Sequence, residues 1–137
     1  LFGTLFLALF IALEELYMWV LAIEMPEGFI EFMLSEPLIL GLISVVIIAP
    51  IAEEFIFRGF LFSQLQNTRL GPWGAITLSS LLWTVIHFQY EFKILLVLFV
   101  FGLFLGYLRM AYQSLSLPII LHAINNLFAF VMAYFYF

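Results

Sequence analysis

The run IIAPIAEEFIFRGF, residues 47–60, places two glutamates and an arginine in an otherwise apolar stretch. Glu54 and Arg58 are four residues apart, so on a helix they share one face and can neutralise each other. Glu53 points about 100° away from that face and has no cation at helical spacing along its own helix. An unpaired carboxylate in a bilayer costs roughly 2.5–3.5 kcal/mol on insertion scales. We therefore expect Glu53 to face water, a metal ion or polar side chains of other helices.

The two histidines of the chain, His87 and His122, both lie in long apolar runs. Asn126 follows His122 by four residues and shares its helical face. Sites in helical bundles are built from side chains that point inward from several helices, so Glu53, both histidines and Asn126 could meet in one core. Such a set offers a base for a water molecule and donors for a developing oxyanion, as peptide hydrolysis requires.

Each feature also has a purely structural interpretation. Glu54 and Arg58 could form an ion pair that only helps the helices to pack. His87 could cap the C-terminal end of its helix, and Asn126 could join helices by a hydrogen bond worth about 0.6 kcal/mol on average. We favour a shared site, because the structural interpretation needs a separate explanation for each histidine and for Glu53.

The composition indicates which elements position these residues. Of the 137 residues, 66% are apolar and 9% are charged, whereas a soluble domain has about 25% charged residues. This shortage predicts an integral membrane protein.

The net charge of −5 gives no indication of nucleic-acid binding, and the lack of cysteine excludes disulfides and thiolate chemistry. The chain begins with Leu1 rather than methionine, and we expect it to be an excerpt of a longer one.

A helical span needs about 20 mostly apolar residues. Four stretches approach this length, namely residues 38–66, 72–88, 93–112 and 118–137. A fifth, residues 1–23, is interrupted by Glu14 and Glu15. We predict an all-α, multi-pass transmembrane helical bundle of four to five spans. Residues 1–137 are expected to form a single domain with 38–137 as its motif-bearing core.

Three further residue patterns bear on orientation and packing. Arg69 and Arg109 flank loops on one side of the bilayer, which predicts that this side is cytoplasmic. The GxxxG spacing of Gly102 and Gly106 lets another helix approach closely, unless the two glycines are incidental. Pro50 removes a helical hydrogen bond, so we expect the helix to bend one turn before the acidic pair.

Three motifs occur in order along the predicted spans. EEFIFR (53–58) matches EExxxR, WTVIH (83–87) resembles FxxxH, and HAINN (122–126) matches HxxxN. Together they resemble the CAAX-protease and bacteriocin-processing family, also called the Abi family, which includes the type II CAAX prenyl endopeptidases. The resemblance covers about residues 38–130. One departure is Trp83 in place of phenylalanine, which we interpret as a packing residue.

The resemblance implies an intramembrane endopeptidase that cleaves a membrane-associated, in some relatives prenylated, substrate. Carried over by position, it implies that Glu53 and His87 activate a water molecule. His122 and Asn126 would then hold the scissile carbonyl and its oxyanion. The expected partners are membrane lipids and a peptide or protein with a membrane anchor, in a bacterial cell membrane or a eukaryotic organelle membrane.

The same resemblance places Glu54 and Arg58 in the site, with Arg58 orienting the acidic pair. It leaves the need for a metal open. Glu53, His87 and His122 could bind a divalent metal such as zinc, but the close HExxH spacing is absent.

Two other functions compete with the protease. A non-catalytic membrane immunity or scaffold protein could keep this fold, although such a protein could lose any one of the motif residues. A proton or cation pathway would also use intramembrane glutamate and histidine. The lack of acidic residues in the last three predicted spans weakens that alternative.

Overall fold

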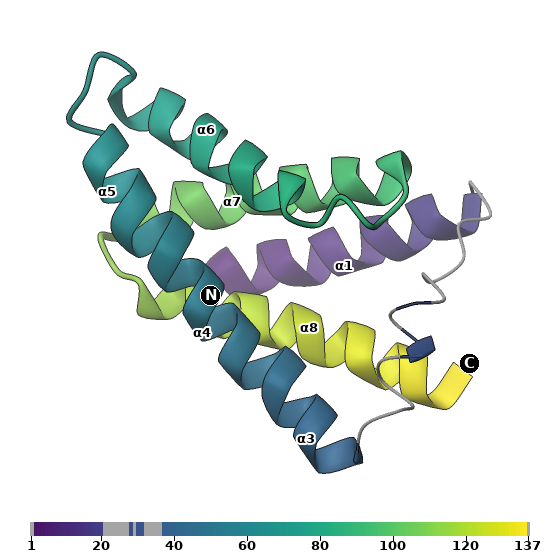
Figure 1. Cartoon of the computed structure of the whole chain (residues 1–137). Coiled ribbons are helices and arrows are strands. Elements are labelled where there is room, and N and C mark those ends of the chain that lie inside the picture. The colour runs from purple at the N-terminus through teal and green to yellow at the C-terminus, as the bar shows by residue number, and fades with distance from the viewer. Residues whose placement is uncertain (1, 21–27, 29, 32–36, 137) are drawn as a thin grey trace. The chain divides into compact units, whose positions relative to one another are not determined.

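The structure is a computed structural model that describes residues 2–20, 28, 30–31 and 37–136. Every regular element in these ranges is helical, which confirms the predicted all-α class (Figure 1). The elements in chain order are α1 (Phe2–Val20), α3 (Leu38–Leu42), η1 (Ile43–Ile48), α4 (Ala49–Glu54), η2 (Phe55–Leu61), α5 (Phe62–Leu65), α6 (Gly71–Val85), α7 (Phe92–Tyr112) and α8 (Ser116–Tyr136).

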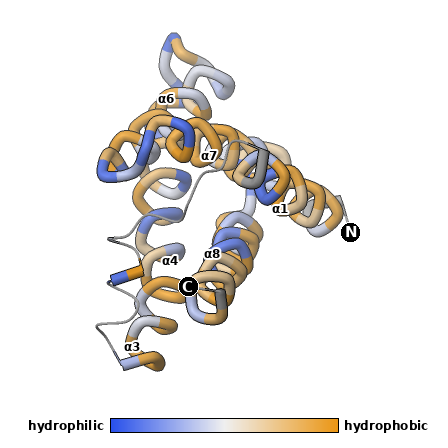
Figure 2. Tube along the Cα trace, turned by 90° about the vertical axis from the view of Figure 1, so that its right-hand side faces the viewer, coloured by the Kyte–Doolittle hydropathy of each residue, from blue (hydrophilic) through white to orange (hydrophobic). Residues whose placement is uncertain are grey.

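Within the described ranges, three helices are long and apolar enough to cross a membrane: Leu38–Leu65, Phe92–Tyr112 and Ser116–Phe135. They match three of the predicted spans, and Figure 2 shows hydrophobic residues along them. Helices α1 and α6 form where two more spans were predicted, but α6 has only 15 residues. Residues 21–23 of the predicted first span lie outside the described ranges.

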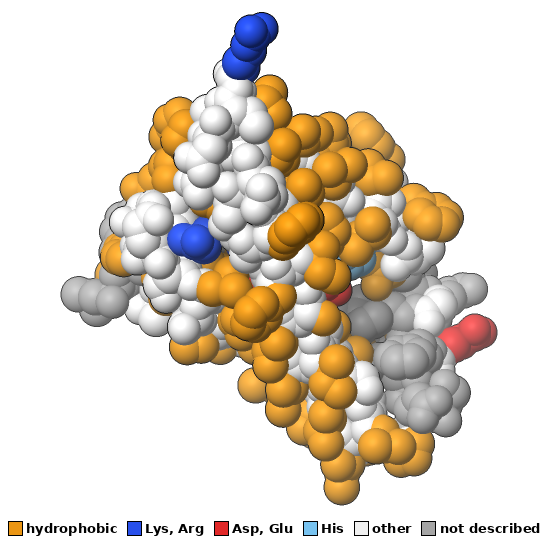
Figure 3. All heavy atoms as spheres, turned by 60° about the vertical axis from the view of Figure 1, so that its left-hand side comes forward, with side chains coloured by type: hydrophobic (Ala, Val, Ile, Leu, Met, Phe, Trp, Pro, Cys, Tyr) orange, Lys and Arg blue, Asp and Glu red, His pale blue; other side chains and the backbone are white. Residues whose placement is uncertain are grey.

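Large hydrophobic side chains cover much of the outside of the helices (Figure 3). Ile39 is 69% exposed, Phe60 66% and Phe88 79%. In water such a surface would be a liability, because soluble monomers rarely expose large continuous apolar patches. The exposed apolar surface therefore fits a chain whose solvent is lipid.

The chain divides into two compact units. The first unit contains residues Leu1–Pro50 and Leu121–Phe137, and the second contains Ile51–Ile120. The second unit thus carries the EExxxR and FxxxH motifs, and the first carries HxxxN. That residues 1–137 act as a single domain stays a prediction.

In the first unit, the turns before Pro50 are wider than an α-helix. The segment η1 ends two residues before the proline, and the N–H of Ala49 donates to the carbonyl of Ser44, five residues back. The next bond of this pattern would join Pro50 to Val45, but proline has no N–H. Asn126 of α8 supplies the missing donor, since its Nδ2 lies 3.0 Å from the Val45 carbonyl oxygen. The turns before the proline are thus a π-helical segment, and the predicted bend stays a prediction.

In the second unit, the two glycines of α7 let this helix lie close against α6. A Cβ atom on Gly106 would stand 2.9 Å from Cγ2 of Ile76, and one on Gly102 would stand 3.0 Å from Cβ of Ser80. Real Cβ atoms essentially never show a contact as short as the first. The GxxxG prediction is confirmed, and its partner helix is α6.

Gly106→Ala should therefore destabilise the protein by about 1–3 kcal/mol, the usual cost of overpacking a filled core. The measurement is the melting temperature in detergent. Gly41→Ala is the matched control, because a Cβ there would meet Phe130 at 3.6 Å, an ordinary contact distance. Equal melting temperatures for the two variants would contradict the close approach of α6 and α7.

Candidate active site

The second unit contains a fully buried ion pair. Glu54 and Arg58 are both 0% exposed, and Nη1 of Arg58 donates to Oε1 of Glu54 at 2.9 Å. Nη2 of Arg58 donates to the carbonyl oxygen of Gly102 in α7 at 3.0 Å. The guanidinium carbon lies 5.0 Å from the centroid of the Trp83 ring, within the range of a cation–π interaction. The predicted pairing of Glu54 with Arg58 is confirmed, and it also ties their helix to α6 and α7.

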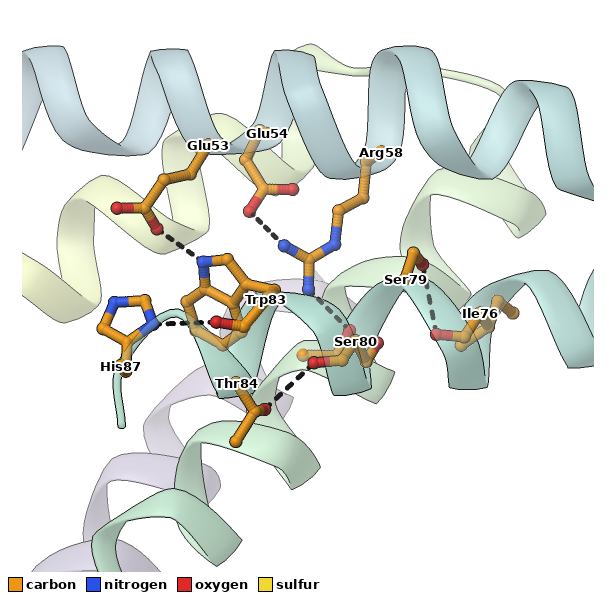
Figure 4. Close-up of polar contacts among 10 residues, drawn as sticks. Glu53, Glu54, Arg58, Ile76, Ser79, Ser80, Trp83, Thr84 and His87 are labelled. Carbon is orange, nitrogen blue, oxygen red and sulfur yellow. Dashed lines mark hydrogen bonds and ion pairs between the residues drawn. The ribbon is translucent and has the colours of Figure 1, made fainter. Parts of the chain in front are cut away.

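Glu53 faces α6 rather than the ion pair (Figure 4). Its Oε2 accepts a hydrogen bond of 2.5 Å from Nε1 of Trp83, and the contact is partly buried. The requirement that Glu53 meet a polar group of another helix is thereby confirmed. The interpretation of Trp83 as a packing residue was incomplete, because its indole also carries the donor.

His87 lies just beyond the end of α6, and its Nδ1 is 2.9 Å from the Trp83 carbonyl oxygen. A carbonyl oxygen can only accept, so Nδ1 carries the proton in this bond. In the neutral ring Nε2 is then the acceptor nitrogen. The structural interpretation of His87 as a cap holds, and the cap also selects the tautomer that can accept a proton from water.

Tyr90 is a residue of this region that the sequence analysis missed. Its ring stacks on His87 with centroids 6.0 Å apart. The pKa of the Tyr90 phenol is raised, mainly because the side chain is partly buried. A hydrogen bond with Gln89 lowers this pKa, and the charge of Glu53 raises it. No motif includes this tyrosine, and the 20% aromatic content gives nothing to distinguish it. The only signal was its position three residues after His87.

The first unit holds the other two predicted site residues on α8. His122 is only 3% exposed, and Asn126 is partly buried. Asn126 already donates to Val45, which bears out its structural interpretation. A side-chain amide has two N–H groups, so one donor remains for another acceptor. Glu53, Glu54, Arg58 and His87 are gathered within the second unit, and their meeting with the α8 pair stays a prediction.

No group of three or more His, Cys, Asp or Glu side chains that could hold a metal ion occurs within the described ranges. The ligand set Glu53, His87 and His122 is divided between the two units and stays a prediction. The need for a metal stays open, to be tested by a chelator.

Comparison with known proteins now identifies the family. Residues 35–128 match the family model described as type II CAAX prenyl endopeptidase Rce1-like. The chain belongs to this family. The apolar helices found in the described ranges agree that this member is a membrane protein. The ordered EExxxR, FxxxH and HxxxN motifs all lie within the matched residues.

Two curated relatives of this Rce1-like chain are similar in sequence. One is an uncharacterised 24.3 kDa protein of Escherichia coli, 34% identical over 86 residues, which are 61% of the chain and 40% of the relative. The other is the membrane-embedded CAAX protease MroQ of Staphylococcus aureus, 33% identical over 92 residues, which are 64% of the chain and 36% of MroQ. The match thus spans less than half of each relative. No solved structure matches the chain.

The two adjacent glutamates should respond differently to the same substitution. Glu54→Gln leaves the Arg58 charge buried without its counter-charge, so we expect a loss of about 3–5 kcal/mol of stability. Glu53→Gln keeps an oxygen that can accept from Trp83, so its melting temperature in detergent should stay within a few degrees of the parent. Equal melting losses in the two variants would contradict separate roles.

Proposed function

We propose that the protein is an intramembrane endopeptidase that hydrolyses a peptide bond of a membrane-anchored substrate through water activated by Glu53 and His87. The observation that carries this proposal is the arrangement around Trp83. Its indole holds the Glu53 carboxylate, and its carbonyl holds His87 in the tautomer with an acceptor Nε2. Two groups able to accept a proton from water are therefore fixed by one residue of α6.

In the proposed reaction, Glu53 takes a proton from a water molecule that Nε2 of His87 orients. The water oxygen bonds to the carbonyl carbon of the peptide, and the carbonyl oxygen becomes an oxyanion. His122 and the second N–H of Asn126 donate to this oxyanion. Glu53 then passes its proton to the leaving nitrogen as the carbon–nitrogen bond breaks, which restores the carboxylate. Preorganised donors of this kind act mainly where charge develops in the transition state.

Arg58 and Glu54 have a supporting role in this proposal. Their pair is fully buried, so it has no access to a substrate from solvent. It fixes the face on which Glu53 projects, because the two glutamates are neighbours on one helix. Arg58 also lies against the Trp83 ring that donates to Glu53.

The substrate class follows from the setting and from the relatives. A site among apolar helices favours a peptide that a membrane anchor holds at the bilayer, and the relative MroQ is named as a membrane-embedded CAAX protease. A prenylated C-terminal peptide is therefore the first substrate to try. A divalent metal such as zinc, held by Glu53, His87 and His122, would lower the pKa of the bound water.

The first experiment is a cleavage assay with purified protein in lipid, using one peptide with and without a prenyl group, each with and without a chelator. We expect cleavage of the anchored peptide by the parent and none by Glu53→Gln or His87→Ala. Loss of cleavage with the chelator, restored by zinc, would establish the metal. If the parent cleaves no anchored peptide, a membrane immunity or scaffold protein of the same fold becomes the better interpretation. The capping bond of His87 and the helix-joining bond of Asn126 would suit that role.

Asn126→Ala should lower kcat by about 10²–10³, the usual effect of losing one oxyanion donor, with KM nearly unchanged. Losing the bond to Val45 should cost only about 0.6 kcal/mol of stability. Asn125→Ala is the matched control, since Oδ1 of Asn125 is buried with no hydrogen-bond partner among the described residues. An equal loss of activity in both variants would rule out the oxyanion role.

A further inference from the structure

We infer that Trp83 is a positioning residue that holds the carboxylate of Glu53 through its indole N–H. For its effect on catalysis this inference rests on the proposed function, but the bond itself can be tested without any substrate. The family motif has phenylalanine at this position, and phenylalanine has no such donor. Tryptophan in place of phenylalanine therefore adds a hydrogen bond to Glu53 that packing alone does not need.

The indole is fixed on several sides within the second unit. Trp83 is only 1% exposed, and the Arg58 guanidinium carbon stands 5.0 Å from its ring centroid. Phe101 of α7 packs at a centroid distance of 6.4 Å. Gly102 leaves room for the ring, because a Cβ there would lie 3.2 Å from Cε3 of Trp83. A ring so enclosed keeps its N–H directed at Oε2 of Glu53, 2.5 Å away.

Trp83 bonds Glu53 and His87 through different parts of the residue. The side chain donates to Glu53, whereas the backbone carbonyl accepts from His87. Trp83→Phe therefore removes the bond to Glu53 and retains the one to His87. It also retains an aromatic face for Arg58. One substitution thus separates the polar contact from the packing.

The direct test is the indole ¹⁵N–¹H spectrum of the protein in detergent. The chain has three tryptophans, Trp19, Trp73 and Trp83, and the Trp83 signal is assigned by its loss in Trp83→Phe. A hydrogen bond to a carboxylate is short and strong, so we expect this signal at low field in the parent. In Glu53→Ala it should move upfield, while the signal of Trp73, which is 64% exposed, should stay in place. An unmoved Trp83 signal would overturn the inference.

The second test is kinetic and uses a peptide that the parent cleaves. A hydrogen bond to a charged group contributes about 1.5–3 kcal/mol, so Trp83→Phe should lower kcat by roughly 10- to 100-fold. KM should be unchanged. The melting temperature should fall moderately, because the Glu53 carboxylate loses its indole donor. Trp73→Phe is the matched control and should cleave normally. Parent-like turnover by Trp83→Phe would also overturn the inference.

The two tests separate failure of the inference from failure of the proposed function. If Glu53→Ala moves the Trp83 signal but the parent cleaves nothing, the bond stands and the protease proposal fails. If the parent cleaves the peptide and the signal does not move, the protease proposal stands and the inference fails. If the Trp83→Phe protein does not fold, the comparison of the parent with Glu53→Ala decides. The Trp83 signal is then identified by its slow hydrogen exchange.

Discussion

The arrangement of the second unit depends on the burial of one guanidinium group. Arg58 has no exposed surface, and a charge in such a place is costly unless it is paired and hydrogen-bonded. Its partners come from three directions: the carboxylate of Glu54, the carbonyl of Gly102 and the ring of Trp83. Each partner constrains a different helix. This one buried charge accounts for three features. The glycine at position 102 lets the guanidinium reach the backbone carbonyl, the indole of Trp83 presents its face to the guanidinium, and Glu54 points toward it.

Adjacent glutamates acquire different properties because the helix turns between them. Glu54 is directed into the protein and is matched by a fixed cation. Glu53 is only partly buried and meets a neutral donor. Two carboxylates in different environments can take different roles, as in other hydrolytic sites. In this chain the difference comes from about 100° of rotation along a helix rather than from distance along the sequence.

Much of this organisation was predictable from the sequence, and the parts that were not share a physical cause. The apolar runs predicted the long helices, the spacing of Glu54 and Arg58 predicted their bond, and GxxxG predicted a close helix neighbour. The cap that His87 forms was predicted as an alternative, and its partner is a carbonyl of its own helix. The partner of Asn126 was not predictable, because it is a backbone carbonyl of another helix and every residue has one. The contact between Glu53 and Trp83 joins side chains 30 residues apart. It was not predictable, because a tryptophan in an apolar helix is interpreted equally well as a packing residue. The π-helical segments and the shortness of α6 were also not predictable from the hydropathy pattern.

Pro50 and Asn126 are 76 positions apart in the sequence, yet the backbone of one helix makes them interdependent. The ring of the proline leaves the Val45 carbonyl without its main-chain donor, and the amide of Asn126 occupies that place. Replacing the proline would restore an N–H that competes for the same oxygen, and the asparagine would lose its anchor. The two positions are therefore expected to vary together among homologues. The missing main-chain hydrogen bond at Val45 thereby fixes the side-chain rotamer of Asn126 on α8. The second amide hydrogen of Asn126 then points in a fixed direction.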